Sequence, residues 1–226
     1  MSGRRLIVAI DGPAGAGKST VAARLAAKFG LLNLETGAMY RAFALKAIEG
    51  GVPFSDPDML EQLAAVTSIA LEPTPSGNRV LLDGKDVTGR IRDAAVTKAA
   101  SQVSVHPAIR RWMVDLQRTL GEKGGIVMEG RDIGTVVFPH ADLKIFLDAS
   151  PEARGERRYE QSGKAASPEA ILRDIRERDE RDRTREQSPL KPAPDAVVID
   201  STNLTLDEVV GRVADLVTAR LAQAAD

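Results

Sequence analysis

The residues with the most specific chemistry lie in a glycine-rich segment near the amino terminus. Residues 12–19 match G-x-x-x-x-G-K-[ST], the pattern of a phosphate-binding loop. Glycines in such a loop let successive backbone N–H groups converge on a phosphate, and the positive end of the following helix adds to the attraction. Lys18 is expected to reach the outer phosphates, and the Ser19 hydroxyl to coordinate Mg²⁺. The segment therefore predicts binding of a nucleoside triphosphate together with Mg²⁺.

Three classes of protein share such a loop: small-molecule kinases, switch GTPases or ATPases, and motor or assembly ATPases. A GTPase would need a base-reading motif N/T-K-x-D, which the sequence lacks. A motor usually has an apolar strand that ends in an acidic metal ligand, and residues 126–129 match this pattern only in part. A chain of 226 residues also leaves little room for a separate recognition domain. We therefore favour a kinase.

Arginines are the next group of residues that could do chemistry. Arg41 shares a helical side with Leu45 and Ile48, so it is either a rim residue with a snorkelling stem or a ligand for an anion. Arg131 and Asp132 directly follow an apolar run that indicates a buried strand, and the carboxyl ends of parallel strands face the ligand. We expect both side chains to point toward the phosphate loop. The alternative is an exposed turn whose ion pair contributes little to stability.

A charged helix near the carboxyl end provides a third cluster, and it starts with the capping sequence at 167–169. Five residues share one face of this helix: Ile171, Ile175, Arg178, Asp182 and Arg185. No apolar residue occurs from 176 to 187, so this half is either a solvated strut or one wall of a charged site. Beside a phosphate-binding loop we favour the wall. Phosphoryl transfer to a phosphorylated acceptor concentrates negative oxygens, and arginines offset that charge.

A regular framework must position these groups, and the hydrophobic pattern predicts one. Apolar runs that indicate buried strands occur at 6–10, 126–128, 143–147 and 196–199. Helices are predicted at 18–29, 36–50 with Thr36 as N-cap, 56–65, 94–120 with a break at His106-Pro107, and 205–224. Residues 69–87 indicate a small antiparallel sheet with turns at 73–78 and 83–84. Strands that alternate with helices predict an α/β fold of three layers around a mostly parallel sheet.

Composition excludes several functions. With 31 Lys and Arg against 32 Asp and Glu, the net charge of -1 rules out a chain-wide basic field for nucleic acid or an anionic membrane. The absence of Cys rules out disulfides and thiolate metal sites, and it fits a reducing cytosol. No apolar run approaches the length that spans a membrane. His106 and His140 are isolated, and Trp112 is expected to pack, so the sequence predicts no histidine metal centre.

Taken together, the motifs resemble those of the bacterial cytidylate kinases, a nucleoside monophosphate kinase family of P-loop proteins. The resemblance runs nearly end to end. It rests on the segments 10–20 (IDGPAGAGKST), 35–42 (ETGAMYRA), 100–103 (ASQV), 129–139 (EGRDIGTVVFP), 144–150 (KIFLDAS), 178–185 (RDERDRTR) and 200–202 (DST). The segments 129–139 and 178–185 are far more specific than the phosphate loop. One departure is Glu35, where the family commonly has Asp.

The resemblance implies a P-loop fold with a parallel five-stranded core sheet, formed by residues of about 1–35, 101–150 and 188–226. It also implies an inserted subdomain at about 36–100, which binds the nucleotide acceptor and contains the small antiparallel sheet. A short lid would lie at about 150–167.

It further implies the following site residues. For ATP these are Gly12, Pro13, Ala14, Gly15, Ala16, Gly17, Lys18, Ser19, Thr20 and Arg157, with Arg154 and Arg158 as the other lid arginines that could approach it. For CMP they are Arg41 and Arg131 at the phosphate, Thr36, Arg110, Asp132 and Arg185 at the cytosine, and Ser101, Arg178 and Asp182 at the ribose. The catalytic groups would be Lys18, Arg131, Asp132 and Arg185, and Ser19 would hold Mg²⁺.

The expected activity is ATP-dependent phosphorylation of CMP and dCMP in pyrimidine nucleotide metabolism, with Mg²⁺ and without a covalent enzyme intermediate. The expected protein is a cytoplasmic monomer that binds neither nucleic acid nor a membrane. Two alternatives stay open from the sequence. One is a monophosphate kinase for UMP or AMP, and the other is a switch ATPase that acts on a protein partner.

Overall fold

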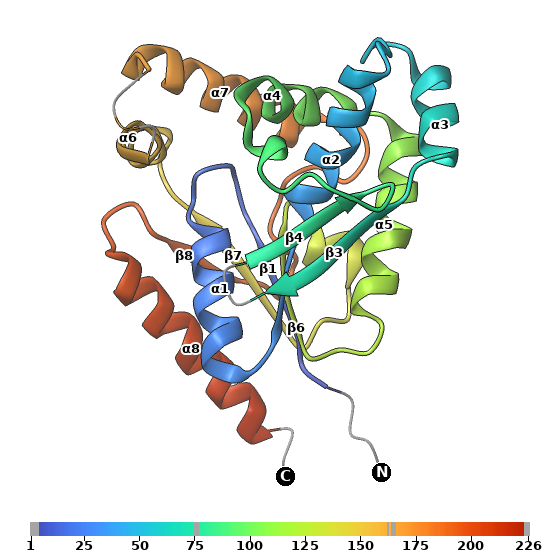
Figure 1. Cartoon of the computed structure of the whole chain (residues 1–226). Coiled ribbons are helices and arrows are strands. Elements are labelled where there is room, and N and C mark those ends of the chain that lie inside the picture. The colour runs from blue at the N-terminus through green and yellow to red at the C-terminus, as the bar shows by residue number, and fades with distance from the viewer. Residues whose placement is uncertain (1–4, 75–76, 162, 164–165, 224–226) are drawn as a thin grey trace.

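The computed structural model describes residues 5–74, 77–161, 163 and 166–223. Its central sheet has five parallel strands in the order β2-β6-β1-β7-β8 (Figure 1). The strands are β1 Ile7–Asp11, β2 Leu32–Glu35, β6 Ile126–Gly130, β7 Leu143–Asp148 and β8 Val197–Asp200. Every residue of β1 and β6 is buried, because helices cover both faces of the sheet and such strands need no polar side. The parallel five-stranded core is confirmed.

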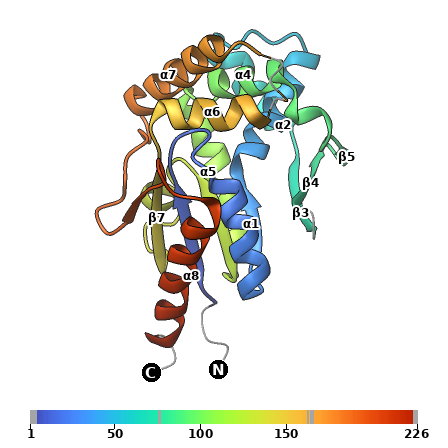
Figure 2. The ribbon, with the colours of Figure 1, turned by 90° about the vertical axis from the view of Figure 1, so that its left-hand side faces the viewer.

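Helices cover both faces of this sheet, and further helices lie beyond the carboxyl ends of its strands (Figures 1 and 2). They are α1 Lys18–Phe29, α2 Thr36–Glu49, α3 Pro57–Ala65, α4 Ala94–Val103, α5 Pro107–Gly121, α6 Pro151–Gln161, α7 Pro168–Thr184 and α8 Leu206–Gln223. Val8 and Ile10 of β1 join a core with α1 and α8, whereas Ile7 and Ala9 join a separate core with α2 and α5. Alternate residues of one strand thus pack into two cores, and the three-layer α/β fold is confirmed. No helix among the described residues is long and apolar enough to cross a membrane.

A small antiparallel sheet lies beside the main one, as predicted, in the order β3-β4-β5. Its strands are β3 Ile69–Thr74, β4 Gly77–Leu82 and β5 Lys85–Asp86, and it projects from the molecule in Figure 2. Residues 75–76 of the expected turn lie outside the described residues. The side-chain amide of Asn78 donates to the Asn33 carbonyl at 2.9 Å and accepts from the Glu35 N–H at 3.5 Å. The hairpin is thereby attached to the free edge of β2.

The helix boundaries agree with the sequence pattern except at one cap. The predicted break at His106-Pro107 separates α4 from α5, and His106 Nε2 lies 2.6 Å from the Phe54 carbonyl oxygen. The prediction that Thr36 caps α2 is wrong, because Glu35 occupies the N-cap position and Thr36 is the first helical residue. The Thr36 hydroxyl instead donates to the Glu129 carbonyl at 2.8 Å. The predicted last residue of α8, Ala224, lies outside the described residues.

Two elements, β2 and α6, have no clear hydrophobic pattern in the sequence, and neither was predicted. β2 is an edge strand in which only Leu34 is buried, while Leu32 is half exposed. α6 lies in the expected lid and carries mostly charged residues, of which Arg154 and Gly155 are buried. Neither element has a continuous apolar face. Polar contacts with other segments of the same protein hold both of them, so the spacing of hydrophobic residues could not reveal them.

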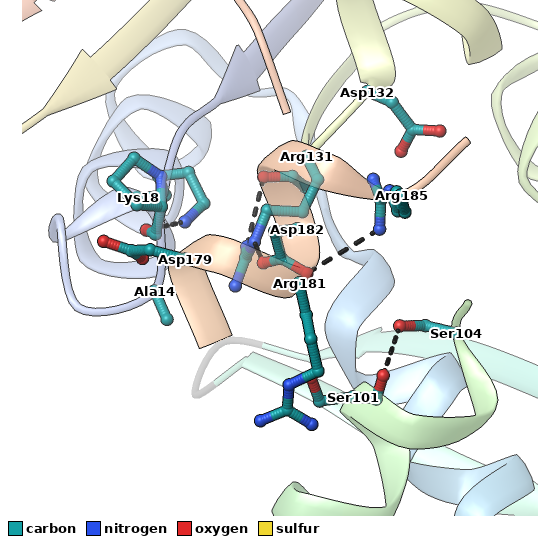
Figure 3. A network of polar contacts seen from close by, with 12 residues as sticks. Ala14, Lys18, Ser101, Ser104, Arg131, Asp132, Asp179, Arg181, Asp182 and Arg185 are labelled. Atoms are coloured by element: carbon teal, nitrogen blue, oxygen red, sulfur yellow. Dashed lines mark hydrogen bonds and ion pairs between the residues drawn. The ribbon is translucent and has the colours of Figure 1, made fainter. Parts of the chain in front are cut away.

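Arg154 is the residue that attaches α6 to the rest of the protein. Its guanidinium is 1% exposed and donates to the carbonyls of Ala149 at 2.8 Å and of Ala14 at 3.0 Å. It also forms a two-point pair with the Asp179 carboxylate of α7, with one bond of 2.9 Å. Figure 3 shows Asp179 next to Ala14 of the phosphate loop. One buried side chain therefore joins α6, α7 and the loop after β1.

We predict that Asp179→Ala lowers the free energy of unfolding by about 3 kcal/mol, because it leaves the buried Arg154 guanidinium without its anion. Equilibrium urea unfolding measures this loss. Asp174→Ala is the matched control, since Asp174 is exposed on the same helix; it should change stability by less than about 0.5 kcal/mol. Equal stabilities for the two variants would contradict the role assigned to the Arg154 pair.

Candidate active site

The carboxyl ends of three neighbouring strands form one edge of a cleft. β1 is followed by the phosphate loop, β6 by Arg131 and Asp132, and β2 by Thr36. β6 pairs in parallel with both other strands, so these segments begin at the same end of the sheet. The bond from Thr36 to the Glu129 carbonyl joins the ends of β2 and β6 directly. The cleft thus brings the segment after β6 together with two segments that lie about 90 to 120 residues earlier in the chain.

The phosphate loop has a backbone that only glycine can follow. Gly12 has φ of 148°, and a Cβ at this position would lie 2.0 Å from the Leu147 carbonyl oxygen. Gly15 has φ of 80°, and its Cβ would lie 3.3 Å from the Cβ of Arg154. A buried strand precedes the loop and a helix follows it, which is the context that the motif requires. The structure therefore supplies what the sequence pattern predicted for residues 12–19.

Lys18 lies at the base of this loop in an environment that disfavours its charge. Its side chain is 5% exposed, and Nζ donates to the Pro13 carbonyl at 2.7 Å. Burial is the main reason that its pKa falls to about 7, and the nearby Arg131 lowers it further, whereas Glu129 opposes the shift. A phosphate bound at the loop would supply the negative charge that this ammonium lacks.

Ser19 and Glu129 place two oxygen ligands beside the loop. The Ser19 hydroxyl donates to Glu129 Oε1 at 3.0 Å, and Glu129 is buried at the end of β6. Burial raises the pKa of Glu129, and Lys18 partly offsets the shift. No group of three or more His, Cys, Asp or Glu that could hold a metal occurs among the described residues. A hydroxyl and one carboxylate fit Mg²⁺, which usually takes one or two protein oxygens together with substrate phosphates.

All nine residues expected around the acceptor line a single cleft, which is continuous with the phosphate loop at Lys18 and Ser19. They are Thr36, Arg41, Ser101, Arg110, Arg131, Asp132, Arg178, Asp182 and Arg185. They come from helices α2, α4, α5 and α7, from the turn after β6 and from the residue that ends α7, so the predicted grouping is one that only the folded chain can produce. The charged end of α7 is buried against this cleft at Asp182 and Arg185, which excludes a fully solvated strut.

Ion pairs hold the cleft in shape. Arg131 Nε donates to Asp182 Oδ2 at 2.9 Å, and Arg185 Nη1 lies 3.7 Å from the other oxygen of Asp182 (Figure 3). Arg110 pairs with Asp132, and it also donates to the Ser104 carbonyl at 3.2 Å. Each carboxylate therefore fixes at least one arginine while its remaining lone pairs stay available. Near the mouth, Arg41 pairs with Glu35, so Arg41 is not merely a snorkelling rim residue.

The cleft is nevertheless short of negative charge and of hydrogen-bond acceptors. Seven cationic side chains line it, against four carboxylates. The cations are Lys18, Arg41, Arg110, Arg131, Arg158, Arg178 and Arg185, and the carboxylates are Glu35, Glu129, Asp132 and Asp182. Buried atoms without a partner include Arg41 Nε, Ser101 Oγ, Arg110 Nε, Arg178 Nε and Arg185 Nη2. Folded proteins rarely leave such atoms unpaired, so this arrangement fits a polar, anionic ligand.

The three lid arginines have three different environments. The Arg154 guanidinium bonds to the carbonyls of Ala149 and Ala14 and to Asp179, and its approach to ATP stays a prediction. Arg158 lines the acceptor cleft. Arg157 lies on the other side of the loop, where it lines a smaller cavity with Gly17 and Thr20 and donates to Ser201 Oγ at 3.1 Å. Arg158 thus shares a cavity with Lys18 and Ser19 of α1, whereas Arg157 shares one with Thr20 and Val21.

Several lining residues were not assigned from the sequence. Tyr40 lies one helical turn after Thr36, and Ser104 lies three residues after Ser101, so helical spacing could have found both. Glu129 ends a buried strand, which is a usual place for a functional acid. Arg158 was expected as a lid arginine that could approach ATP, but nothing except its charge pointed to this cleft. Asp11 also went unassigned, although burial raises its pKa to about 7 despite hydrogen bonds from two backbone N–H groups.

A phosphate loop that opens directly into an arginine-lined acceptor cleft defines a P-loop kinase. A family model described as "Cytidylate kinase" matches residues 8–219. The chain is 49% identical to the cytidylate kinase of Geobacillus kaustophilus over 221 residues, which is 96% of this chain and 99% of that one. It is 52% identical to that of Pelotomaculum thermopropionicum, over 94% and 96% of the two chains. The chain belongs to the cytidylate kinase family.

The solved structures with similar chains are more distant. The shikimate kinase of Acinetobacter baumannii has a TM-score of 0.48 at 16% identity, over 95% of this chain and 94% of that one. A TM-score at this level adds nothing to the assignment, which rests on the family model and the curated relatives.

The low pKa of Lys18 predicts that ATP binding at pH 8 takes up a proton. Lys18 is largely neutral there in the free protein, and triphosphate oxygens beside Nζ would raise its pKa and favour the ammonium. Calorimetric titrations in two buffers of different ionisation enthalpy measure this uptake. Lys18→Arg is the control, because arginine stays charged at this pH. Its uptake should be lower by up to one proton, and equal uptake in the two proteins would contradict the assignment of Lys18.

Proposed function

We propose that this chain transfers the γ-phosphoryl group of ATP to CMP and dCMP, giving ADP and CDP or dCDP. The observation that carries the proposal is the continuity of the phosphate loop with a cleft that has surplus arginines and unpaired buried donors. A donor site and an acceptor site that share one cleft allow the two reacting oxygens to lie in line. Membership of the cytidylate kinase family supports the same substrates.

Asp132 and Arg110 suit the cytosine base. Cytosine presents an amino donor next to a ring-nitrogen acceptor, and the Asp132 carboxylate and Arg110 guanidinium offer the complementary pair. Uracil reverses both groups, so it would leave this buried pair mismatched. Such a mismatch in a site built for hydrogen bonding discriminates strongly. We propose that Thr36 and Arg185 complete the cytosine side.

The ribose and the phosphate of the acceptor would lie nearer the phosphate loop. We propose that Ser101, Arg178 and Asp182 bind the sugar. Ser101 Oγ and Arg178 Nε are buried without a partner, and both need one. Arg41 and Arg131 would bind the phosphate, since each has one carboxylate partner and guanidinium nitrogens left over.

The chemistry needs charge stabilisation and alignment rather than a covalent intermediate. The groups proposed to act in transfer are Lys18, Arg131, Asp132 and Arg185. Positive groups at fixed positions stabilise the charge that develops on the transferred phosphoryl group. Asp132 has a different part, because it holds Arg110 and thereby sets the pose of the acceptor.

Residues 12–20 and Arg157 are proposed to bind ATP. The cavity between Arg157 and α1 lies on the side of the loop away from the acceptor cleft, which suits the part of ATP that does not react. Ser19 and Glu129 would hold Mg²⁺. Bound with ATP, Mg²⁺ would neutralise charge on the β- and γ-phosphates.

The domain boundaries remain proposals as well. We propose that the subdomain of about residues 36–100 and the lid of about 150–167 close over bound nucleotides and exclude water, so that ATP is not hydrolysed. We also propose that the protein works as a cytoplasmic monomer, with ATP and CMP or dCMP as its only partners, independent of nucleic acid or a membrane. Light scattering at several protein concentrations tests the oligomeric state.

A coupled assay for ADP tests the activity itself. ADP should form from Mg-ATP when CMP or dCMP is added, and UMP should be used at least about 100-fold less efficiently. Lys18→Ala should abolish transfer without loss of the folded state, because Lys18 bonds only a loop carbonyl. Steady ATP hydrolysis without any acceptor would instead identify a switch ATPase, and preference for UMP or AMP would identify a different monophosphate kinase.

Asp182→Asn tests the proposed sugar site. The variant keeps the shape of the side chain, but it removes the charge that holds Arg131 and accepts from ribose hydroxyls. We predict that kcat/KM for CMP falls about 5-fold to 150-fold, equivalent to about 1–3 kcal/mol. The loss for dCMP should be smaller, because dCMP lacks one hydroxyl. The exposed Asp174→Asn is the control. Equal losses for both acceptors would place Asp182 away from the sugar.

A further inference from the structure

Asp11 is a buried carboxylate that the mechanism above does not use. It ends β1, next to Gly12 of the phosphate loop, and it is 4% exposed. Its two oxygens accept from two consecutive backbone N–H groups: Oδ1 from Ile133 and Oδ2 from Gly134, each at 2.7 Å. Among the described residues, no lysine or arginine side chain bonds to it. The carboxylate is therefore committed to the backbone of another segment.

That segment is a π-helical turn, Ile133–Val137, which directly follows Arg131 and Asp132. Its other end is held by cations. Arg118 donates to the carbonyls of Val136 at 2.8 Å and Val137 at 3.2 Å, and Lys144 Nζ donates to the Pro139 carbonyl at 2.6 Å. An anion at the free N–H groups and cations at the free carbonyls match the charge that a helical turn presents at its two ends.

The π-helical turn packs closely against Lys144 and Asp11. A Cβ at Gly134 would lie 3.2 Å from Lys144 Cδ and 3.4 Å from Asp11 Oδ2, so even a methyl group would be tight there. The contacts of Asp11, Arg118 and Lys144 thus hold the turn against β1. Because Arg131 and Asp132 precede it with no intervening residue, their backbone is fixed by the same contacts.

We propose that Asp11 is a positioning residue that sets the separation between the donor loop and the acceptor-binding pair Arg131 and Asp132. The carboxylate joins the last residue before the loop to the first residues after the pair. Transfer in line requires both phosphates within a few tenths of an ångström of their reactive positions, and such alignment contributes much of the rate. The inference rests on the proposed kinase function, because it assigns the separation a role in transfer.

A purely structural cap would behave differently. If Asp11 only stabilised the fold, its loss would lower stability and leave the kinetics of the remaining folded protein unchanged. A positioning residue acts through Arg131 and Asp132, so its loss changes how the acceptor is used while ATP binding persists. The two roles are separated by the kinetic constants of the two substrates.

The test is Asp11→Asn, which keeps the size of the side chain but turns an amide NH₂ toward one of the two N–H groups. We expect kcat to fall at least 10-fold and the KM for CMP to rise at least threefold. The Kd for ATP, measured by calorimetry without acceptor, should change less than twofold. Asp142→Asn is the matched control, because Asp142 accepts from the Ile7 N–H at 2.8 Å at the opposite end of the same strand. It should leave all three constants unchanged.

A double-mutant cycle with Arg131→Ala measures whether Asp11 acts through Arg131. Asp11→Asn should cost much less in kcat/KM for CMP when Arg131 is already absent, because the two act through one segment. Fully additive losses, unchanged CMP kinetics in Asp11→Asn, or an equal loss of ATP affinity would each overturn the proposal. If Asp11→Asn does not fold, Gly134→Ala is the second test, because its methyl group would press on the same turn. It should likewise lower kcat and raise the KM for CMP while the Kd for ATP stays nearly unchanged. Failure of the wild-type protein to phosphorylate CMP would overturn the proposed function instead.

Discussion

The central constraint on this structure is that many basic side chains must lie close together in one cleft before any ligand offsets their repulsion. Seven cationic side chains share one cleft, where poor solvation strengthens their mutual repulsion. Four carboxylates lie among them, and Asp132 and Asp182 are each placed against arginines. The compensation is incomplete, and it has to be, because a neutral cleft would have nothing to offer a phosphate. Among the described residues, nitrogens of Arg41, Arg178 and Arg185 are buried without a partner, which leaves them available in our proposal for substrate.

Helix α7 distributes this charge between the two ends of the cleft. Asp179 faces the lid side, where it neutralises Arg154 above the phosphate loop. Asp182, less than one turn later, faces the acceptor side and holds Arg131. A shift of α7 along its axis would therefore disturb the contacts of donor and acceptor groups at once. Its amino-terminal half is anchored by the buried Ile171 and Ile175, and the Arg154 pair resists such a shift further along.

Much of this could be predicted from the sequence, for identifiable reasons. Parallel strands between helices are continuous apolar runs, so four of the five were found from the residues. The expectation that 196–199 is a buried strand is only partly right, because β8 lies at the sheet edge and within it only Ile199 is buried. The phosphate loop needs glycine at fixed spacing, and the resemblance to a family supplied the nine residues of the acceptor cleft. Elements without an apolar face were missed, namely β2 and α6. Thr36 was taken for a cap because threonine favours that position, but its hydroxyl bonds β6 instead.

The sequence by itself determined the class of fold, the phosphate loop and a set of nine residues that line one cleft, because each depends on local pattern or on motif. Only the tertiary structure decided which of those residues contact one another. It paired Arg131 with Asp182 and Arg110 with Asp132, it bonded Arg154 to Asp179, and it bonded Asp11 to a turn more than 120 residues away. Such pairings depend on which strand ends become neighbours in the sheet. That order is set by packing over the whole chain, and no local stretch of sequence contains it.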